Sequence, residues 1–313
     1  MSHCYQVIRI AQMTSVAAIL VLAFAITGAG QFSTSTQENQ TILRNIEWQR
    51  VRRQMDRLDN ISKTNGPTPG RAENNPKIIL DSVYRRSTDG EKLLMSAEKE
   101  DVSKYENFLA QANTGLTKLI RDFGCDEYSP LTKNLQICAE FSMPGGGSAF
   151  SFRQSDYQFW KLSDLLYDGK SFIAFGQMSL GFIVDLGDIP IENVGLTTKG
   201  LSAMTNFQPS SDFVSATKQN NEFVDGVNLD GQLYKKFLPA VINNTYVLRS
   251  IAFKGQVPQQ HFEIKYNELD FDKRKDVIVA FRVIRSDING SVSIVWKILQ
   301  AKAAPELKGA KQI

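Results

Sequence analysis

Residues 276–299 have the sequence DVIVAFRVIRSDINGSVSIVWKIL, which contains two runs rich in β-branched and aromatic residues. The runs are Asp276–Arg285 and Ser291–Leu299. Apolar residues recur at every second position of the second run, the pattern of a strand with one buried face: Val292, Ile294, Trp296 and Ile298. Asn289-Gly290 lies between the runs and supplies the positive φ angles that a tight hairpin turn requires. The segment therefore predicts an antiparallel hairpin.

Further strands are predicted upstream of this hairpin. Tyr246–Phe253 alternates in the same way and completes a three-stranded meander. Three earlier strands are expected at Phe159–Leu166, Ser171–Phe175 and Leu180–Leu186, with Asp168-Gly169 as the turn between the first two. Helical patterns cover residues 91–121 and 210–224. Strands that follow a helical section indicate an α+β fold, here a mainly antiparallel sheet with packed helices.

The N-terminus carries a membrane-targeting segment. No charged residue occurs from Ile10 to Gln37, and Val16–Ile26 is apolar throughout, so partition into a bilayer is favourable. A signal peptide cleaved near Ala29 or Gly30 fits this pattern. An uncleaved membrane anchor also fits, and a buried core helix is the remaining alternative. Both membrane alternatives place the chain beyond residue 31 outside the cytoplasm.

Three parts of the chain are expected. Residues 1–30 form the signal peptide or membrane anchor. Residues 31–70 form a flexible and helical lead-in that ends in a Pro- and Gly-rich linker; its helix, over residues 42–63, either packs on the main domain or binds a partner. Residues 71–313 form the α+β globular domain.

Cys125 and Cys138 lie in a Pro- and Gly-rich stretch of the exported part. In an oxidising compartment the two are expected to form a disulfide, and two buried free thiols are the alternative. Two cysteines do not complete a tetrahedral metal shell and no histidine is near them in the sequence, so no metal site is predicted.

The charge of the chain is nearly balanced. It has 36 basic and 33 acidic residues and a net charge of +3, which gives no field that would favour nucleic acid. A basic cluster within residues 44–57 contains acidic residues and indicates a solvated helix face or contact with an acidic surface. The expected partners are the membrane, through an uncleaved N-terminal segment, and, as the other option, a protein.

The sequence contains no specific catalytic or cofactor motif. His261 is the single histidine beyond the N-terminal segment, and it is expected in an exposed loop with no nucleophile motif nearby. The nucleophile elbow Gly-x-Ser-x-Gly is absent. Gly145-Gly146-Gly147 lacks the lysine of a phosphate-binding loop and is expected to be a loop. No cofactor is predicted.

Paired carboxylates are the remaining candidates for catalysis. Asp185 and Asp188 flank a turn and could serve a carboxylate-dependent hydrolase, although capping of the strand end and turn formation are the favoured explanation for them. The acidic cluster Glu268–Asp272 precedes three basic residues and is expected to be a solvated turn rather than a calcium site.

These observations favour an extracytoplasmic binding or interaction module of unknown ligand. A carboxylate-dependent hydrolase and a single-pass anchored sensor or regulator are the alternatives.

Overall fold

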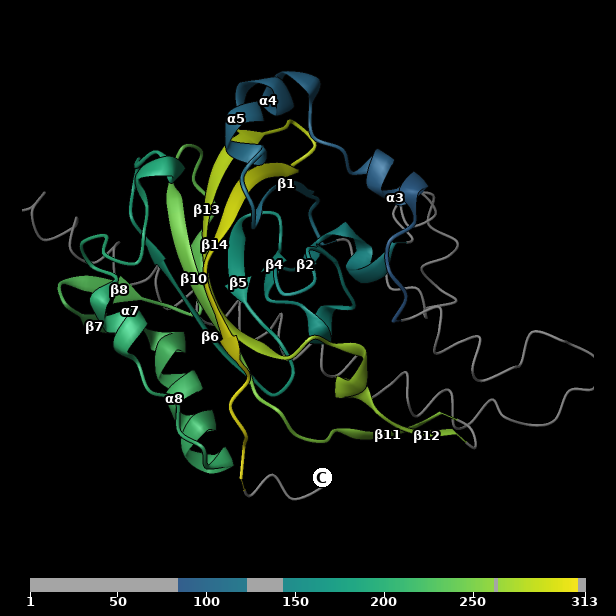
Figure 1. Cartoon of the computed structure of the whole chain (residues 1–313), viewed down its shortest axis with the longest axis vertical. Coiled ribbons are helices and arrows are strands. Elements are labelled where there is room, and N and C mark those ends of the chain that lie inside the picture. Colours follow the sequence, from purple (N-terminus) through teal and green to yellow (C-terminus); the bar gives the residue numbers. More distant parts are fainter. Residues whose placement is uncertain (1–83, 123–142, 262–263, 309–313) are drawn as a thin grey trace, which may run out of the picture. The chain divides into compact units, whose positions relative to one another are not determined.

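The computed structural model of the chain describes residues 84–122, 143–261 and 264–308 (Figure 1). The predicted export segment, the lead-in and the Cys125–Cys138 disulfide lie outside these residues. None of the helices in the described ranges has the length and hydropathy needed to cross a bilayer.

A large antiparallel sheet is the centre of the fold. Its strand order is β1-β14-β13-β10-β6, so β6 lies at one edge and β1 at the other. The strands are β1 (Thr114–Leu119), β6 (Ser179–Asp185), β10 (Thr245–Ala252), β13 (Lys275–Ser286) and β14 (Val292–Ala303). The neighbouring strands β10, β13 and β14 confirm the predicted meander.

A smaller antiparallel sheet faces the large one. Its strand order is β3-β2-β4-β5-β9. The strands are β2 (Ala149–Ser151), β3 (Asp156–Tyr157), β4 (Leu165–Tyr167), β5 (Ser171–Ala174) and β9 (Phe237–Pro239). The predicted strand over Phe159–Leu166 is shorter than expected, because Trp160–Leu162 forms a 3₁₀ turn before β4.

Helices and two small hairpins surround the sheets. The helices are α3 (Asp89–Leu94), α4 (Lys99–Lys104), α5 (Glu106–Leu109), α7 (Ser202–Asn206) and α8 (Phe213–Asp225). The hairpins are β7 (Val227–Leu229) with β8 (Gln232–Tyr234), and β11 (Pro258–His261) with β12 (Ile264–Asn267). Short 3₁₀ helices cover Pro144–Gly147, Ile191–Asn193 and Glu268–Phe271. The described part is thus mostly antiparallel sheet with a few helices, consistent with the predicted α+β class.

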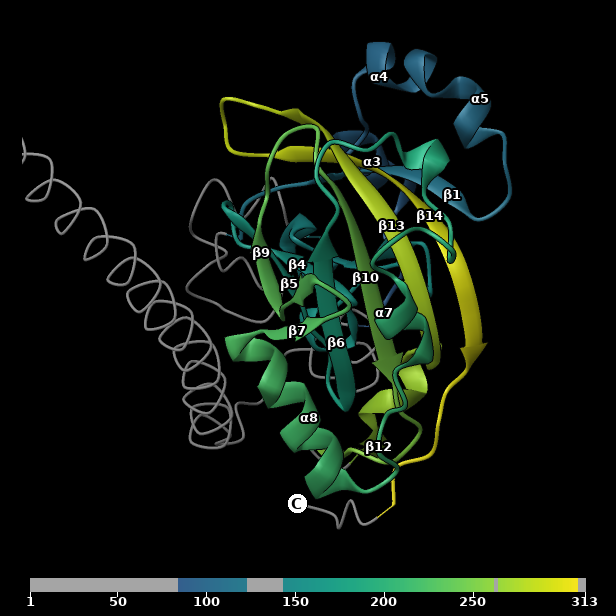
Figure 2. The same ribbon diagram turned by 90° about the vertical axis from the view of Figure 1, so that its left-hand side faces the viewer.

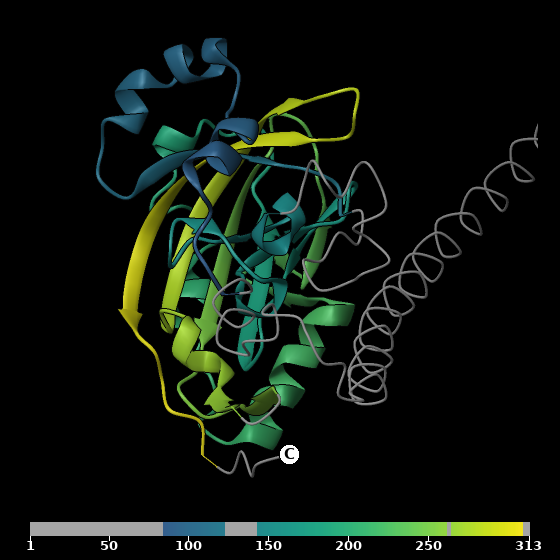
Figure 3. The same ribbon diagram turned by 90° about the vertical axis from the view of Figure 1, so that its right-hand side faces the viewer.

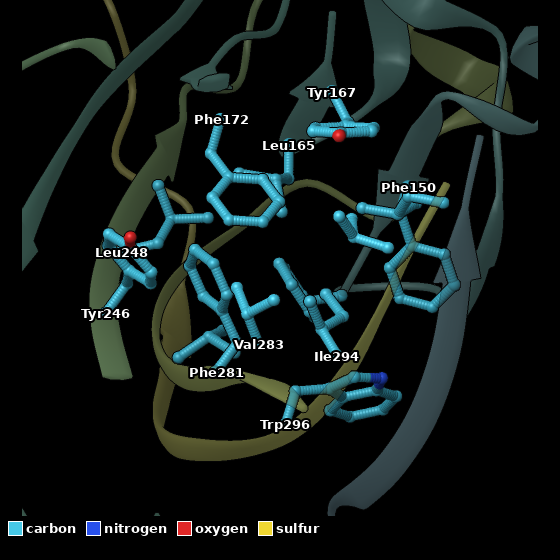
Figure 4. Packing of buried hydrophobic residues seen from close by; sticks show 14 of the residues in the cluster. Phe150, Leu165, Tyr167, Phe172, Tyr246, Leu248, Phe281, Val283, Ile294 and Trp296 are labelled. Carbon is cyan, nitrogen blue, oxygen red and sulfur yellow. The ribbon is translucent and has the colours of Figure 1, made fainter. Parts of the chain in front are cut away.

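The main core lies between the two sheets (Figure 4). Phe172 from the small sheet packs against Tyr246 and Phe281 from the large sheet, with ring centroids 5.0 to 5.5 Å apart. Trp296 of β14 contacts Phe150 of β2 with a centroid distance of 5.9 Å. Burying rings of this size is the main favourable contribution to holding the sheets together.

A second core covers the opposite face of the large sheet, where α7 and α8 lie. Phe182 of β6 stacks on Phe223 of α8 with centroids 4.2 Å apart, and Tyr234 of β8 closes the cluster. Figure 2 shows α8 alongside β6. The helix predicted over residues 210–224 is therefore confirmed.

The segment predicted as helix up to residue 121 is only partly helical. Residues 114–119 form β1, which pairs with β14, so this part of the prediction was wrong. Leu116 and Leu119 have the three-residue spacing of a helix face, but pairing with the exposed edge of β14 satisfies the backbone of this segment instead.

Candidate binding site at the edge of the large sheet

The candidate carboxylates Asp185 and Asp188 both have local partners. Asp185 accepts hydrogen bonds from the Gly187 backbone N–H at 2.8 Å and from the Asn244 amide at 2.8 Å. Asp188 forms an ion pair with Arg282 at 2.6 Å, and 71% of its side chain is exposed. Both contacts stabilise the turn after β6.

A cavity of about 500 Å³ lies at the other end of β6. It is bounded by the start of β6, one face of α8, the segment that follows β10 and Leu307 near the C-terminus. Neither Asp185 nor Asp188 lines it. Its volume is within the range of ligand pockets in proteins.

The walls combine apolar and uncharged polar side chains. Among the described residues that line the cavity, none is charged. The polar side chains are Gln177, Ser179, Thr217, Asn220, Gln256 and Gln259. Apolar walls come chiefly from Met178, Leu180, Phe213, Ala216, Phe253 and Leu307. Such walls suit a neutral ligand with both apolar and hydrogen-bonding groups, because a charged ligand would be desolvated without a counter-charge.

The helix α8 contributes four residues from one face. Phe213, Ala216, Thr217 and Asn220 follow the three- and four-residue spacing that places side chains one above another. Asp212 caps the helix by accepting from the Ser215 N–H at 2.9 Å, and this bond lowers the pKa of the Asp212 carboxyl. The cap fixes where the helix, and thus this wall, begins.

The C-terminal segment closes one side of the cavity. Lys254 donates its backbone N–H to the Pro305 carbonyl at 2.8 Å, and Lys308 donates to the Ser211 carbonyl at 2.6 Å. These bonds tie the end of β10 to the start of α8 and hold Leu307 between them.

The cavity lies beside the first residues of β6, the edge strand of the large sheet. Ile183 exchanges two backbone hydrogen bonds with Lys235, at 2.6 and 2.9 Å, on the side of β6 away from β10. Since strand residues alternate, Gly181 and Ser179 direct their backbone groups to the same outer side. The Gly181 N–H donates to the Asn220 side chain at 3.3 Å, and no described strand pairs with this stretch of β6.

Hydrogen bonds from Arg274 hold the turn before β6 in place. Its guanidinium donates to the Gln177 carbonyl at 2.9 Å, to the Met178 carbonyl at 2.5 Å and to the Phe253 carbonyl at 2.9 Å. Met178 has a φ of 48°, a left-handed conformation that costs energy for a residue with a side chain. Burial of Arg274, and secondarily the neighbouring Arg153, lowers its pKa to about 10. The cavity wall therefore depends on a buried cation.

A buried ion network compensates that charge. Asp272 accepts from Arg274 at 2.8 Å and from Arg153 at 2.9 Å. Arg153 also pairs with Asp164 at 2.5 Å, and Asp164 accepts from Ser250 of β10 at 2.6 Å. The side chains of Arg153, Asp164 and Asp272 are fully buried. Such a network joins the small sheet, the large sheet and the segment before β13.

The predicted solvated turn at Glu268–Asp272 was therefore wrong. Asp272 belongs to the buried network, and Glu268 is only 2% exposed. Glu268 accepts from Tyr84 at 2.8 Å and lies 3.6 Å from the Lys161 ammonium. Burial, and then the nearby Glu268 charge, raises the pKa of Tyr84. The basic neighbours that indicated solvent in the sequence include Arg274, which is itself a buried partner of Asp272.

His261 lies in β11 rather than in a loop. Gly145-Gly146-Gly147 lies in a 3₁₀ turn with positive φ at all three glycines. Gly147 is close to Met95, Met143 and Ile120, so this segment is part of the core packing. The described residues contain no cluster of three or more His, Cys, Asp or Glu arranged to hold a metal.

The fold and the cavity together define a two-sheet antiparallel domain with an uncharged pocket at an open strand edge. No protein-family model, no curated protein and no solved structure matches the chain.

Proposed function

We propose that this protein is a binding module and that the cavity beside β6 is its ligand site. The observation that carries the proposal is the combination of about 500 Å³ of space, apolar walls and six uncharged polar side chains at one place. Candidate acids for catalysis have structural partners elsewhere, and the described residues of the lining include no group that could act as a general acid or base near neutral pH.

The ligand class follows from the lining. Four of the polar side chains are primary amides, which both donate and accept hydrogen bonds, so the ligand carries neutral donors and acceptors. Its apolar part would contact rings such as those of Phe213 and Phe253.

The proposed compartment is outside the cytoplasm. This part of the proposal is supported by the uncharged, apolar N-terminal stretch at Val16–Ile26.

The ligand site is tested with a pair of tryptophan variants on α8. Thr217 lines the cavity and Lys218 does not, and both side chains are exposed. A library of neutral fragments is screened against the full chain by NMR, with the Met178 methyl group as reporter. Thr217→Trp is expected to fill the cavity and weaken binding at least about tenfold, whereas Lys218→Trp leaves it unchanged.

Hits that bind Thr217→Trp as tightly as the native chain contradict the assignment of the site. The absence of any fragment that shifts the Met178 resonance contradicts the proposed function as a whole.

A further inference from the structure

We infer that the ligand is an extended, uncharged peptide segment that adds to the edge of the large sheet as a strand beside β6. This inference rests on the proposed function and names its ligand. Strand addition is a common way for a sheet with an open edge to recognise a peptide, since main-chain hydrogen bonds supply affinity and pockets supply selectivity.

The first argument is the covering of the edge. Along the second half of β6 the edge is covered, because Ile183 pairs with Lys235. Along the first half no described strand pairs with β6; Ser179 lines the cavity, and the Gly181 N–H is bonded by the side chain of Asn220, which also lines it. Strand β6 therefore differs from an edge strand that faces solvent along its whole length: one half is paired, and a pocket lies beside the other half.

The second argument is the role of Asn220. Its side-chain oxygen accepts from the Gly181 N–H at 3.3 Å, a long hydrogen bond made by an amide in the position that a partner strand's carbonyl would take. Asn220 is half-buried and lines the cavity, so it can yield this donor to an incoming main-chain carbonyl.

The third argument is the match of the walls to a strand. Side chains of an added strand alternate between the two faces of the sheet. On the face that carries α8, they would meet Phe213 and Ala216, where the small side chain of Ala216 leaves room. The glutamines at 177, 256 and 259 stand around the peptide backbone as further donors and acceptors.

The pre-formed geometry supports the same ligand. Arg274 holds the carbonyls of Gln177 and Met178 in place, so the start of the β6 edge is rigid before binding. A rigid edge lowers the entropy lost on association.

The experiment uses phage-displayed random ten-residue peptides selected against the full chain in mild detergent. The tightest peptide is synthesised, and each residue in turn is N-methylated. Strand addition predicts that methylation of two residues spaced two apart weakens binding roughly tenfold, because their N–H groups would donate to the outward carbonyls of Ser179 and Gly181 in β6. Methylation at the other residues is expected to change the affinity less than about threefold. Deuterium exchange of the Ser179 amide is expected to slow when the peptide binds.

The variants Thr217→Trp and Lys218→Trp again test whether the ligand binds in the cavity beside β6. A selected peptide that binds both variants equally, or whose methylation scan lacks the two-residue spacing, overturns the inference. If no peptide is selected but neutral glycans on an array bind and are lost in Thr217→Trp, the peptide inference fails and the proposed function stands. If peptides, glycans and fragments all fail to bind, both fall.

Discussion

At the scale of single residues, the acidic side chains of this protein fall into two kinds, buried and exposed. Asp164 is fully buried and accepts from Arg153 and Ser250, whereas Asp188 pairs with Arg282 while most of its side chain stays in water. A buried charge is strongly destabilising when its partner is removed, because water no longer solvates it. A charge at the surface stays solvated, so the loss of its partner costs little.

This difference predicts unequal costs of removal. Asp164→Ala leaves Arg153 with one fewer buried anion and is expected to lower the free energy of unfolding by about 3–5 kcal/mol. Asp188→Ala is the matched control and is expected to cost less than about 1 kcal/mol. Urea denaturation followed by tryptophan fluorescence measures both. Equal costs for the two variants would show that the network contributes no more than a surface pair.

Tyr246 predicts a pH dependence. Its side chain is buried, its hydroxyl donates to the Pro239 carbonyl at 2.7 Å, and burial raises its pKa to about 12. The unfolded chain ionises this group near pH 10. The stabilisation from the neutral hydroxyl is therefore complete below pH 10 and is lost as the pH rises from about 10 to 12, by up to about 1.4 kcal/mol per pH unit.

The check is a comparison with Tyr246→Phe, which lacks the titrating group. The variant is expected to be less stable at pH 8, because the hydrogen bond is lost, but to lose stability less steeply above pH 10. The free energy of unfolding is measured in urea at pH 8, 9, 10 and 11. Parallel curves for the two proteins would exclude Tyr246 as a source of the alkaline loss.

At the scale of elements, the meander of β10, β13 and β14 was predictable because each strand alternates and has one buried face. In the turn between β13 and β14, Gly290 has a φ of 80° and Asn289 does not have a positive φ. The Gly290 N–H donates to the Asp287 carbonyl at 2.9 Å and the Asp287 N–H donates to the Ser291 carbonyl at 2.9 Å, so the turn spans more residues than the predicted Asn289-Gly290 pair. In Figure 3 the tip of this hairpin lies at the same end of the molecule as α4 and α5.

Strand β1 was not predictable in the same way. It carries a glycine at 115 and two leucines at helix spacing, and its pairing depends on β14, which lies far away in the sequence. A Cβ at residue 115 would lie 2.3 Å from the Trp296 ring, so the glycine leaves space for that ring across the strand pair. Only the tertiary partner explains this residue.

Two glycines test the element boundaries. Gly290 needs its left-handed backbone, so Gly290→Ala is expected to lower the free energy of unfolding by about 1–2 kcal/mol. Gly90 lies in α3, and a Cβ added there would meet no other atom within 4 Å, so Gly90→Ala is expected to raise it by about 0.5 kcal/mol. Thermal unfolding of both variants measures whether each substitution raises or lowers the stability. If Gly90→Ala lowered the free energy of unfolding, helix propensity would not determine the stability of α3.

At the scale of the whole molecule, the cavity could not be predicted because four separate segments build it. The one local signal is the spacing of Phe213, Ala216, Thr217 and Asn220, which in the sequence indicates only a helix face. The buried network was equally hidden, since Asp272 lies far from Arg153 and Asp164 in the sequence and each of the three looks like a surface residue by type.

The compartment is the largest-scale prediction. If the apolar stretch at Val16–Ile26 directs export, the mature chain either begins near Gln31 or remains in the membrane fraction with its N-terminus intact. In that compartment we predict that Cys125 and Cys138 form a disulfide, which would close a short loop and stabilise the chain by about 3 kcal/mol. Alkylation without reduction, followed by mass spectrometry of cell fractions, measures both features at once. A cytosolic chain with an intact N-terminus and two alkylated thiols would remove the basis for an extracytoplasmic role, and the proposed ligand of the cavity beside β6 would then have to be sought inside the cell.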